Sequence, residues 1–297
     1  MLKNPLGAFY SIAKVGYIGA FKAAVADGAT AMHLFAKSPR SANLRGEYKE
    51  DAKVAREYFE KSPLTYAVIH AGYVLNFGKP VSKDDIIFKN IVEDLHIAEA
   101  LGINGVVLHM GKHTDTDPDT SRDLFVKNIV DIVKSTKHLK AKLLLENTAG
   151  QGSELGYLFT DFGSMFRAMQ DKLGDDPRLG ACLDTQHSFG AGYDWTDSKK
   201  AKDAIKEFDK EVGLKYIQCV HFNDSKKECG SRRDRHEDIG VGNIGSKALK
   251  NFIMLLNKES SPPPAGGGRS NIPLLLETPE VAATYAQQIQ MVRDWFK

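Results

Sequence analysis

The stretch from residue 84 to residue 146 decides the fold. It contains DDIIFKNIVEDLHIAEALG (84–102), GVVLH (105–109), SRDLFVKNIVDIVKSTKH (121–138) and KLLLE (142–146). In the two long segments apolar residues recur every three or four positions, as in an amphipathic helix, and the two short segments are apolar runs of strand length. A helix that connects two buried strands makes those strands parallel. The stretch therefore predicts consecutive strand–helix units.

The same alternation continues along the whole chain. Eight short apolar runs are strand candidates, at residues 4–10, 29–35, 66–70, 105–109, 142–146, 179–184, 216–221 and 272–277. Eight such units predict a closed parallel barrel of the α/β class, the (β/α)8 or TIM barrel, as a single domain over residues 1–297. An open doubly wound sheet is the alternative, but no GxGxxG sequence follows the first strand. The segment SSPPPAGGGRS (260–270) is expected to be a solvated loop.

The composition is that of an ordinary globular protein, with 42% hydrophobic residues, 26% charged residues and a formal net charge of +2. This charge does not by itself select a partner. No apolar run approaches the roughly 18 residues that cross a membrane, and no secretion signal is expected. The three cysteines have no disulfide-framework spacing. We therefore exclude membrane and disulfide-stapled classes and expect a cytoplasmic protein, or a nuclear one if the source is eukaryotic.

Side chains that bind metals stand at the ends of six successive strand candidates. They are His70, His109, Glu146, Asp184, His221 and Glu277. Functional groups of such barrels come from the carboxyl ends of the strands, so these six are expected to meet at one rim. Two further pairs strengthen this pattern: His187 follows Asp184 by three residues, and Asp234 and His236 lie two apart, on one side of an extended segment.

Five histidines and four carboxylates make nine candidate donors. Zinc binds about four or five donors of this nitrogen and oxygen type, so nine donors predict two or three ions, with at least one carboxylate shared. The mixture favours zinc, with manganese or iron possible, over magnesium. Six other side chains are left out of the set, because they lie inside a strand, on helices or in a loop: His33, His96, His113, His138, Cys182 and Cys219.

Four longer motifs resemble one known family. They are LLLENTAGQGSELG (143–156), CLDTQHSFGAGYD (182–194), HFNDSKKECGSRRDRHEDIGVGNIG (221–245) and IPLLLETP (272–279). These strings are similar to those of endonuclease IV, a family of apurinic/apyrimidinic endonucleases built on a (β/α)8 barrel. The similarity spans nearly the whole chain, and the three motifs ENTAGQG, DTxH and GSRxDRH occur in order.

The resemblance implies a cluster of three zinc ions. His70, His109 and Glu146 would hold the first ion. Glu146 would bridge to a second ion, completed by Asp184, His221 and Glu277, and His187, Asp234 and His236 would hold the third.

The implied reaction is hydrolysis of the phosphodiester bond on the 5′ side of an abasic site in double-stranded DNA. The products are a 3′-hydroxyl and a 5′-deoxyribose phosphate, and trimming of blocked 3′ ends is also expected. Zinc lowers the pKa of bound water to roughly 7 and so supplies a hydroxide nucleophile. Glu146 is the expected residue that orients this nucleophile. We expect a monomer with a role in base excision repair of DNA.

Recognition of an abasic site requires side chains that fill the stack when a nucleotide is extruded. The loop KSPRSAN (37–43), with Arg40, resembles the family's DNA-penetrating loop. Tyr73, with Val74 beside it, resembles the family's intercalating tyrosine. Arg235 lies among the basic residues of the loop 226–235 and is a further candidate for DNA contact.

The chain departs from the family pattern at three places. Ala42 stands where many members have an aromatic residue, and the sequence suggests Trp195 as a possible substitute contact. Phe9, in the first strand, stands where relatives often have histidine. The segment 260–270 resembles an insertion. None of these departures touches one of the nine donors.

Two other functions remain open from the residues alone. Sugar isomerases and epimerases share this barrel, but they usually need fewer metals, mainly carboxylate ligands and a base for proton transfer. A non-catalytic DNA-binding protein with structural zinc is the third possibility. Structural zinc sites are closed and usually rich in cysteine, whereas nine donors shared by three ions leave coordination positions open.

Overall fold

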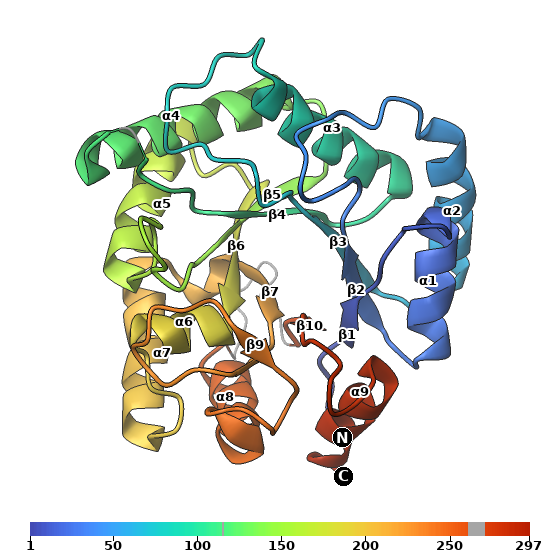
Figure 1. Cartoon of the computed structure of the whole chain (residues 1–297), viewed down its shortest axis with the longest axis vertical. Coiled ribbons are helices and arrows are strands. Elements are labelled where there is room, and N and C mark those ends of the chain that lie inside the picture. The colour runs from blue at the N-terminus through green and yellow to red at the C-terminus, as the bar shows by residue number, and fades with distance from the viewer. Residues whose placement is uncertain (115, 261–270) are drawn as a thin grey trace.

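A computed structural model describes residues 1–114, 116–260 and 271–297. Its central feature is a closed barrel of parallel strands in the order β1-β10-β7-β6-β5-β4-β3-β2 (Figure 1). The strands are β1 (Leu6–Phe9), β2 (Ala31–Leu34), β3 (Tyr66–His70), β4 (Gly105–His109), β5 (Lys142–Glu146), β6 (Leu179–Asp184), β7 (Ile217–His221) and β10 (Leu274–Leu276). The predicted TIM barrel is therefore confirmed, and the open sheet is excluded.

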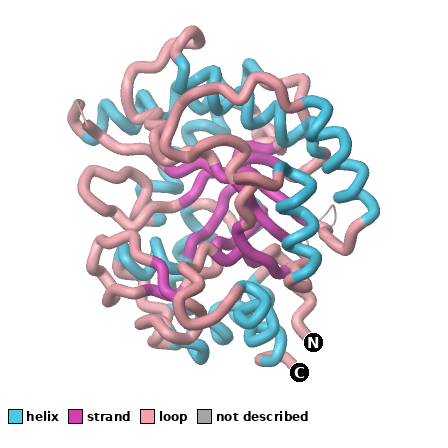
Figure 2. Tube along the Cα trace, turned by 45° about the vertical axis from the view of Figure 1, so that its right-hand side comes forward, coloured by secondary structure: helices cyan, strands magenta, loops and turns pink. Residues whose placement is uncertain are grey.

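The helices form a layer around the strands, so that the barrel lies inside a ring of helices (Figure 2). They are α1 (Gly16–Ala26), α2 (Lys49–Lys61), α3 (Ile86–Leu101), α4 (Pro118–Ser135), α5 (Phe159–Leu173), α6 (Thr185–Ala191), α7 (Ser198–Glu211), α8 (Gly245–Glu259) and α9 (Tyr285–Asp294). A short 3-10 helix, η1 (Leu214–Tyr216), precedes β7. No helix in the described part of the chain is both long and apolar enough to cross a membrane.

Four strands, β3 to β6, have the bounds that the sequence predicts, and the other four are shorter. At the end of β10 the reason is visible. The backbone N–H of Glu277 donates to the side-chain Oδ1 of Asn223 at 2.7 Å instead of continuing the ladder. The predicted loop at 260–270 falls almost wholly on 261–270, which lie outside the described residues.

Capping side chains determine where two helices begin, which the periodicity of apolar residues predicts less accurately. The helix predicted over 121–138 begins at Pro118, because Asp117 caps it and proline is favoured at a first helical position. The last helix, α9, begins at Tyr285. Thr284 and Gln287 form a capping box there, in which each side chain bonds the other residue's backbone.

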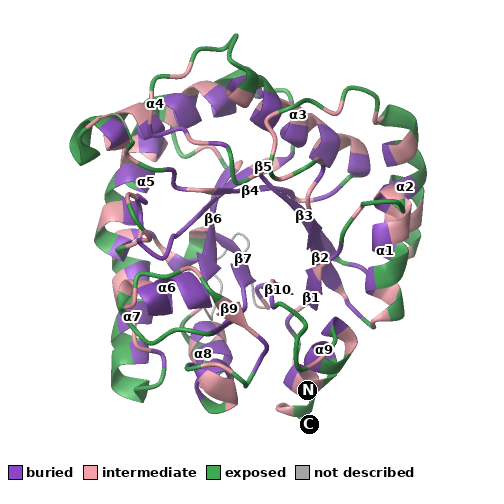
Figure 3. Cartoon of the chain, viewed as in Figure 1, coloured by how far each residue is buried: buried purple, intermediate pink, exposed green. Residues whose placement is uncertain are grey.

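Apolar side chains pack in two places. Most fill the space between the barrel and the surrounding helices, and both helix faces and strands are buried where they meet (Figure 3). A smaller set fills the interior of the barrel itself: Ala31, Tyr66, Val68, Val107, Leu144, Cys182, Cys219 and Leu275. The expectation that the two cysteines pack as small hydrophobic residues is confirmed.

The connection from β7 to α8 contains a small hairpin that periodicity did not indicate. It is formed by the two-residue strands β8 (Asp224–Ser225) and β9 (His236–Glu237), which pair antiparallel. The fully buried carboxylate of Asp224 accepts hydrogen bonds from the backbone N–H groups of Gly240, Gly242, Ile244 and Gly245. A side chain at Gly242 would collide with this carboxylate, because a Cβ atom there would lie 2.5 Å from Asp224 Oδ1. One buried anion therefore fixes the segment that follows β9.

We expect Asp224→Ala to lower the free energy of unfolding by about 2–4 kcal/mol, because several buried N–H groups lose a charged acceptor. Urea denaturation measures this change. Asp203→Ala, at an exposed position on α7, is the matched control and should change stability by less than about 0.5 kcal/mol. Equal stability of the two variants would contradict the anchoring role of Asp224.

Candidate metal centre

The barrel brings the nine predicted donors together at one rim. Five of them are the last residues of β3 to β7, in order His70, His109, Glu146, Asp184 and His221. Glu277 directly follows β10, His187 lies in α6, and Asp234 and His236 come from the loop around β9. His70, Glu146, Asp184, His187 and His221 are at most 3% exposed, and the other four are partly exposed.

The first group consists of His70, His109 and Glu146. The Nε2 atoms of the two histidines lie 3.3 and 3.2 Å from Glu146 Oε2. Two donors on one tetrahedral zinc, each at 2.0–2.1 Å, are about 3.3 Å apart. The spacing of this group is therefore suited to one ion.

The second group uses the other oxygen of the same glutamate. His221 Nδ1 lies 2.7 Å from Glu146 Oε1 and 3.2 Å from Glu277 Oε2. Donor atoms of Glu146, Asp184, His221 and Glu277 all lie within 4.8 Å of one another. Because its two oxygens face different groups, Glu146 has the geometry of a bridging carboxylate.

The third group consists of His187, Asp234 and His236. Asp234 Oδ1 lies 3.5 Å from His187 Nε2 and 3.6 Å from His236 Nε2. Asp184 Oδ2 is 3.7 Å from the same nitrogen of His236, so Asp184 is within reach of the second and third groups. Its other oxygen accepts a hydrogen bond from the backbone N–H of His187 and caps α6.

Hydrogen bonds to backbone carbonyls orient two of the imidazole rings. His70 Nδ1 lies 2.8 Å from the carbonyl oxygen of Ala71, and His187 Nδ1 lies 2.9 Å from that of Asn147. A carbonyl only accepts, so each Nδ1 carries the hydrogen, and in the neutral rings each Nε2 is left as a lone pair that faces the carboxylates. This arrangement fixes the tautomer that binds a metal.

Buried polar atoms without a partner also fit an ion at this rim. Within the described part of the chain, Glu146 Oε2 and His236 Nε2 are shielded from solvent and make no hydrogen bond. Burial of an unpaired carboxylate oxygen is costly. A cation held by these atoms would remove that cost, so the residues present suit a metal centre.

The electrostatics of the centre favour positive charge. Burial alone would raise the pKa of Glu146, but the His221 and His109 rings hold it well below its ordinary value. Burial alone would lower the pKa of His221, but the carboxylates of Glu146 and Glu277 raise it to about 10. Without an ion, protons on the imidazoles balance the carboxylates. Metal binding must displace those protons and therefore weakens as the pH falls.

Two asparagines that the sequence analysis missed hold the donors in position. Asn147 accepts from the backbone N–H of Asp184 at 2.8 Å. Asn223 donates to Asp184 Oδ2 at 2.8 Å and to Glu277 Oε2 at 3.3 Å. Asn147 directly follows Glu146, and Asn223 stands two residues after His221. An asparagine within two residues of a predicted donor at a strand end is the sequence feature that could have identified Asn147 and Asn223.

The residues expected to contact DNA lie beside the centre and are exposed. Tyr73 is 62% exposed and Val74 43% exposed. Arg40 and Tyr73 line one hollow of about 600 Å³, and the backbone N–H of Tyr73 donates to the carbonyl of Pro39 at 3.0 Å. Arg235 and Tyr73 line a cavity of about 410 Å³ together with six of the nine donors. Arg40, Tyr73 and Arg235 therefore lie around the same rim.

Helix α3 anchors the loop that carries Arg40, which the sequence analysis did not detect. Lys37 Nζ lies 3.0 Å from both Glu93 Oε2 and Asp94 Oδ1. Asn90 Nδ2 donates to the carbonyl of Ala42 at 2.8 Å. Buried polar groups of α3 thus hold both sides of the loop.

Trp195 does not lie where the sequence suggested. Its side chain is 1% exposed, and its Nε1 donates to the carbonyl of Thr185 at 3.0 Å. It packs against Phe252, with ring centroids 5.0 Å apart. The suggestion that Trp195 replaces a DNA contact at Ala42 is therefore wrong, because packing between α6 and α8 encloses the indole.

His33 lies closer to the centre than its assignment as a structural histidine implies. The ring is 1% exposed, and its Nδ1 lies 3.7 Å from Glu277 Oε1. Burial lowers the pKa of His33 to about 4. Phe9, one of the departures in the sequence, packs edge-on against this ring at 5.6 Å. The other excluded histidines belong to none of the donor clusters among the described residues.

Comparison with known proteins gives three results. The family described as a xylose isomerase-like TIM barrel matches residues 21–257. A probable endonuclease 4 from Trichlorobacter lovleyi is 34% identical over 280 residues, which cover 94% of each chain. The crystal structure of endonuclease IV from Thermus thermophilus superposes with a TM-score of 0.78 at 30% identity and covers 98% of both chains.

A more distant structure shares the barrel alone. A D-tagatose 3-epimerase-like protein superposes with a TM-score of 0.65 over 98% of this chain and all of its own, but at 16% identity. The barrel is therefore common to proteins of different kinds, whereas near-full-length identity of 30% and above is found with endonuclease IV proteins. Together with the nine donors at the rim, these matches show that the chain belongs to the endonuclease IV family of xylose isomerase-like TIM barrels.

Proposed function

We propose that this protein is a zinc-dependent apurinic/apyrimidinic endonuclease. It hydrolyses the phosphodiester on the 5′ side of an abasic site in double-stranded DNA and leaves a 3′-hydroxyl and a 5′-deoxyribose phosphate. Trimming of blocked 3′ ends is a second activity of the same centre. The observation that carries the proposal is Glu146, whose two oxygens face separate donor groups at a rim lined by exposed Arg235 and Tyr73.

The donor set supports three zinc ions. The first ion is assigned to His70, His109 and Glu146, the second to Glu146, Asp184, His221 and Glu277, and the third to His187, Asp234 and His236. Five imidazoles and four carboxylates suit zinc better than magnesium, which prefers oxygen donors. When bound, zinc supplies Lewis acidity and a nucleophilic hydroxide at neutral pH.

The chain's own residues orient and protect the reaction. Glu146 holds the first two groups at a fixed distance and aligns the attacking oxygen. Asn147 and Asn223 keep the neighbouring carboxylates in place through the hydrogen bonds described above. Arg40 and Arg235 bind DNA phosphates, and Tyr73, with Val74, stacks in the space that the extruded nucleotide leaves.

The two alternatives fit the site less well. A sugar isomerase needs a base for proton transfer and mainly carboxylate ligands, whereas five imidazoles lie at this rim. A structural zinc site is closed by protein donors, while three ions that share nine donors keep positions open for substrate. An incision assay on an abasic duplex, with and without a chelator, separates the three functions.

The first prediction for this centre concerns metal content. We expect close to three zinc ions per chain, and we expect His187→Ala to lose about one of them while the fold survives, because His187 is assigned to the third ion. Elemental analysis after dialysis measures the content. His138→Ala, at an exposed position on the connection after α4, is the control and should keep all ions. One zinc ion per wild-type chain would rule out the trinuclear centre.

The second prediction concerns the bridging carboxylate. Glu146→Gln should bind abasic duplex but lose incision by several powers of ten, because a neutral amide bridges two cations poorly and does not orient the nucleophile. Gel assays of incision and of binding test this, with Glu57→Gln at an exposed site of α2 as the control. Cleavage at a near wild-type rate would refute the proposed role of Glu146.

The third prediction separates recognition from chemistry. Tyr73→Ala and Arg40→Ala should keep their zinc but bind abasic duplex more weakly, by roughly 5- to 150-fold for a lost stacking contact. The loss should be larger on abasic than on intact DNA, because only the abasic duplex has a space to fill. Arg40→Ala should also lower the salt dependence by about one unit of slope if Arg40 contacts a phosphate.

Titration of both variants at two salt concentrations tests this expectation. Lys202→Ala removes one positive charge from an exposed site on α7 and is the matched control. Equal losses on abasic and intact duplex would mean that these residues bind only the backbone, and would contradict the stacking role.

A further inference from the structure

The ring of His33 has a nitrogen whose partner is missing from the described residues. His33 Nε2 lies 3.1 Å from the backbone carbonyl oxygen of Leu276. A carbonyl oxygen only accepts, so Nε2 carries the ring hydrogen, and in the neutral ring Nδ1 is left as a lone pair. This Nδ1 is shielded from solvent and makes no hydrogen bond within the described part of the chain. A buried acceptor of this kind requires a donor or a cation.

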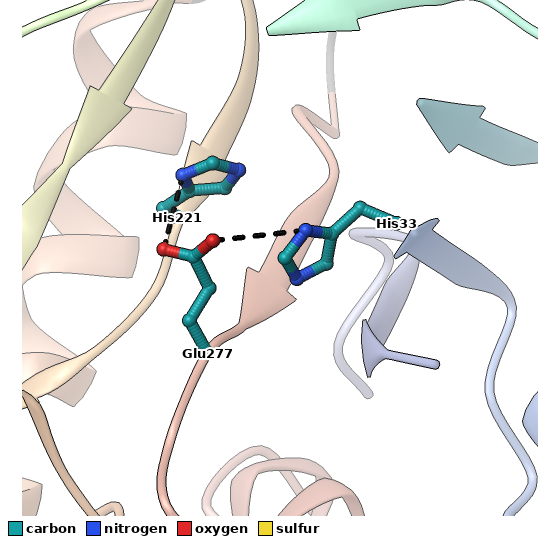
Figure 4. A group of neighbouring side chains, drawn as sticks. All are labelled: His33, His221 and Glu277. Atoms are coloured by element: carbon teal, nitrogen blue, oxygen red, sulfur yellow. Dashed lines mark ion pairs between the residues drawn. The ribbon is translucent and has the colours of Figure 1, made fainter. Parts of the chain in front are cut away.

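The lone pair of His33 points toward a carboxylate. His33 and His221 stand on either side of Glu277 in Figure 4, with Nδ1 of His33 3.7 Å from Glu277 Oε1. The same oxygen lies 4.0 Å from His70 Nε2. The lone pair of His33 Nδ1 therefore faces a carboxylate oxygen and receives no hydrogen bond in the described part of the chain. Two facing acceptors repel each other unless positive charge lies between them.

The distances suit a metal ion. Donor atoms of His33, His221 and Glu277 lie within 4.8 Å of one another. The individual separations of 3.7 Å and, from His221 Nδ1 to Glu277 Oε2, 3.2 Å are close to the roughly 3.3 Å expected for two donors on one zinc. They also match the separations within the three donor groups above.

We propose that His33 is a tenth metal ligand, whose Nδ1 binds, together with His221 and Glu277, the ion next to β10. His33 shares a donor cluster with His221 and Glu277, whereas Glu146 and Asp184 belong to a second cluster that contains the same two residues. This assignment rests on the proposed zinc centre but not on the DNA-cleaving reaction.

The surroundings of His33 hold the ring in the orientation that ligation needs. The hydrogen bond to the carbonyl of Leu276 fixes the tautomer and aims Nδ1 at the rim, as outer hydrogen bonds do for metal-bound histidines in general. Phe9, paired with His33 between β1 and β2, packs edge-on against the ring and blocks its rotation. The ring is therefore preorganised to bind a metal.

The test replaces the imidazole of His33 by a ring that has no nitrogen. We expect His33→Phe to weaken the binding of one zinc ion by about tenfold or more, measured by competition with a chromophoric chelator. The visible spectrum of the Co²⁺-substituted protein should also change, because one nitrogen donor is lost. His138→Phe, at an exposed position, is the matched control and should leave affinity and spectrum unchanged.

A second variant covers the case in which His33→Phe does not fold correctly. If the larger ring of His33→Phe distorts the barrel, as circular dichroism of the metal-free protein would reveal, His33→Ala removes the same nitrogen without added volume and should weaken the same ion. Wild-type zinc affinity and an unchanged Co²⁺ spectrum in the folded variant would overturn the assignment. A wild-type protein that binds its zinc ions but does not cut abasic duplex would contradict the proposed function and leave the ligand test intact.

Discussion

Closure of eight parallel strands into one ring is the constraint on which the whole site depends. In such a ring all carboxyl ends of the strands lie on the same side, so residues far apart in sequence meet there. His70 and Glu277 belong to β3 and to the residue after β10, yet their side chains come within 4.0 Å. No local interaction produces this meeting. It follows from the closed order of paired strands that runs from β1 through β10 back to β2.

The same closure creates an electrostatic problem. Glu146 and Asp184 are fully buried, and Glu277 and Asp234 are partly buried beside them. Carboxylates this close repel one another, and their burial carries a large desolvation cost. Imidazoles compensate part of this cost, and asparagine amides compensate a further part by donating to Asp184 and Glu277. The burial of these carboxylates thus lowers the stability of the rim and raises its affinity for cations, as is common at functional sites.

The sequence alone predicts those features that depend on the periodicity of apolar residues and on the position of polar residues along the chain. The barrel and the six donors at the strand ends follow from alternating helix and strand patterns and from the residue that ends each apolar run. The other three donors, His187, Asp234 and His236, follow from their spacing in two short pairs. Residues whose role depends on a partner from another element were missed or misjudged. Examples are Asn223, which connects two carboxylates from different strands, and Trp195, which looks like an exposed loop aromatic but packs between helices. His33 was set aside for the same reason, because only the closed barrel reveals that its ring faces Leu276 and Glu277 at the end of β10.

In the proposed function, chemistry and recognition are carried by different parts of the fold. The donors stand on strand ends and on short segments fixed by buried carboxylates such as Asp224. The Arg40 loop and Tyr73 instead stand on connections that α3 and a single backbone hydrogen bond hold in place. Loops of this kind can change without disturbing the core. A D-tagatose 3-epimerase-like protein can therefore share the barrel, because function depends on the side chains and loops that a barrel carries rather than on the barrel itself.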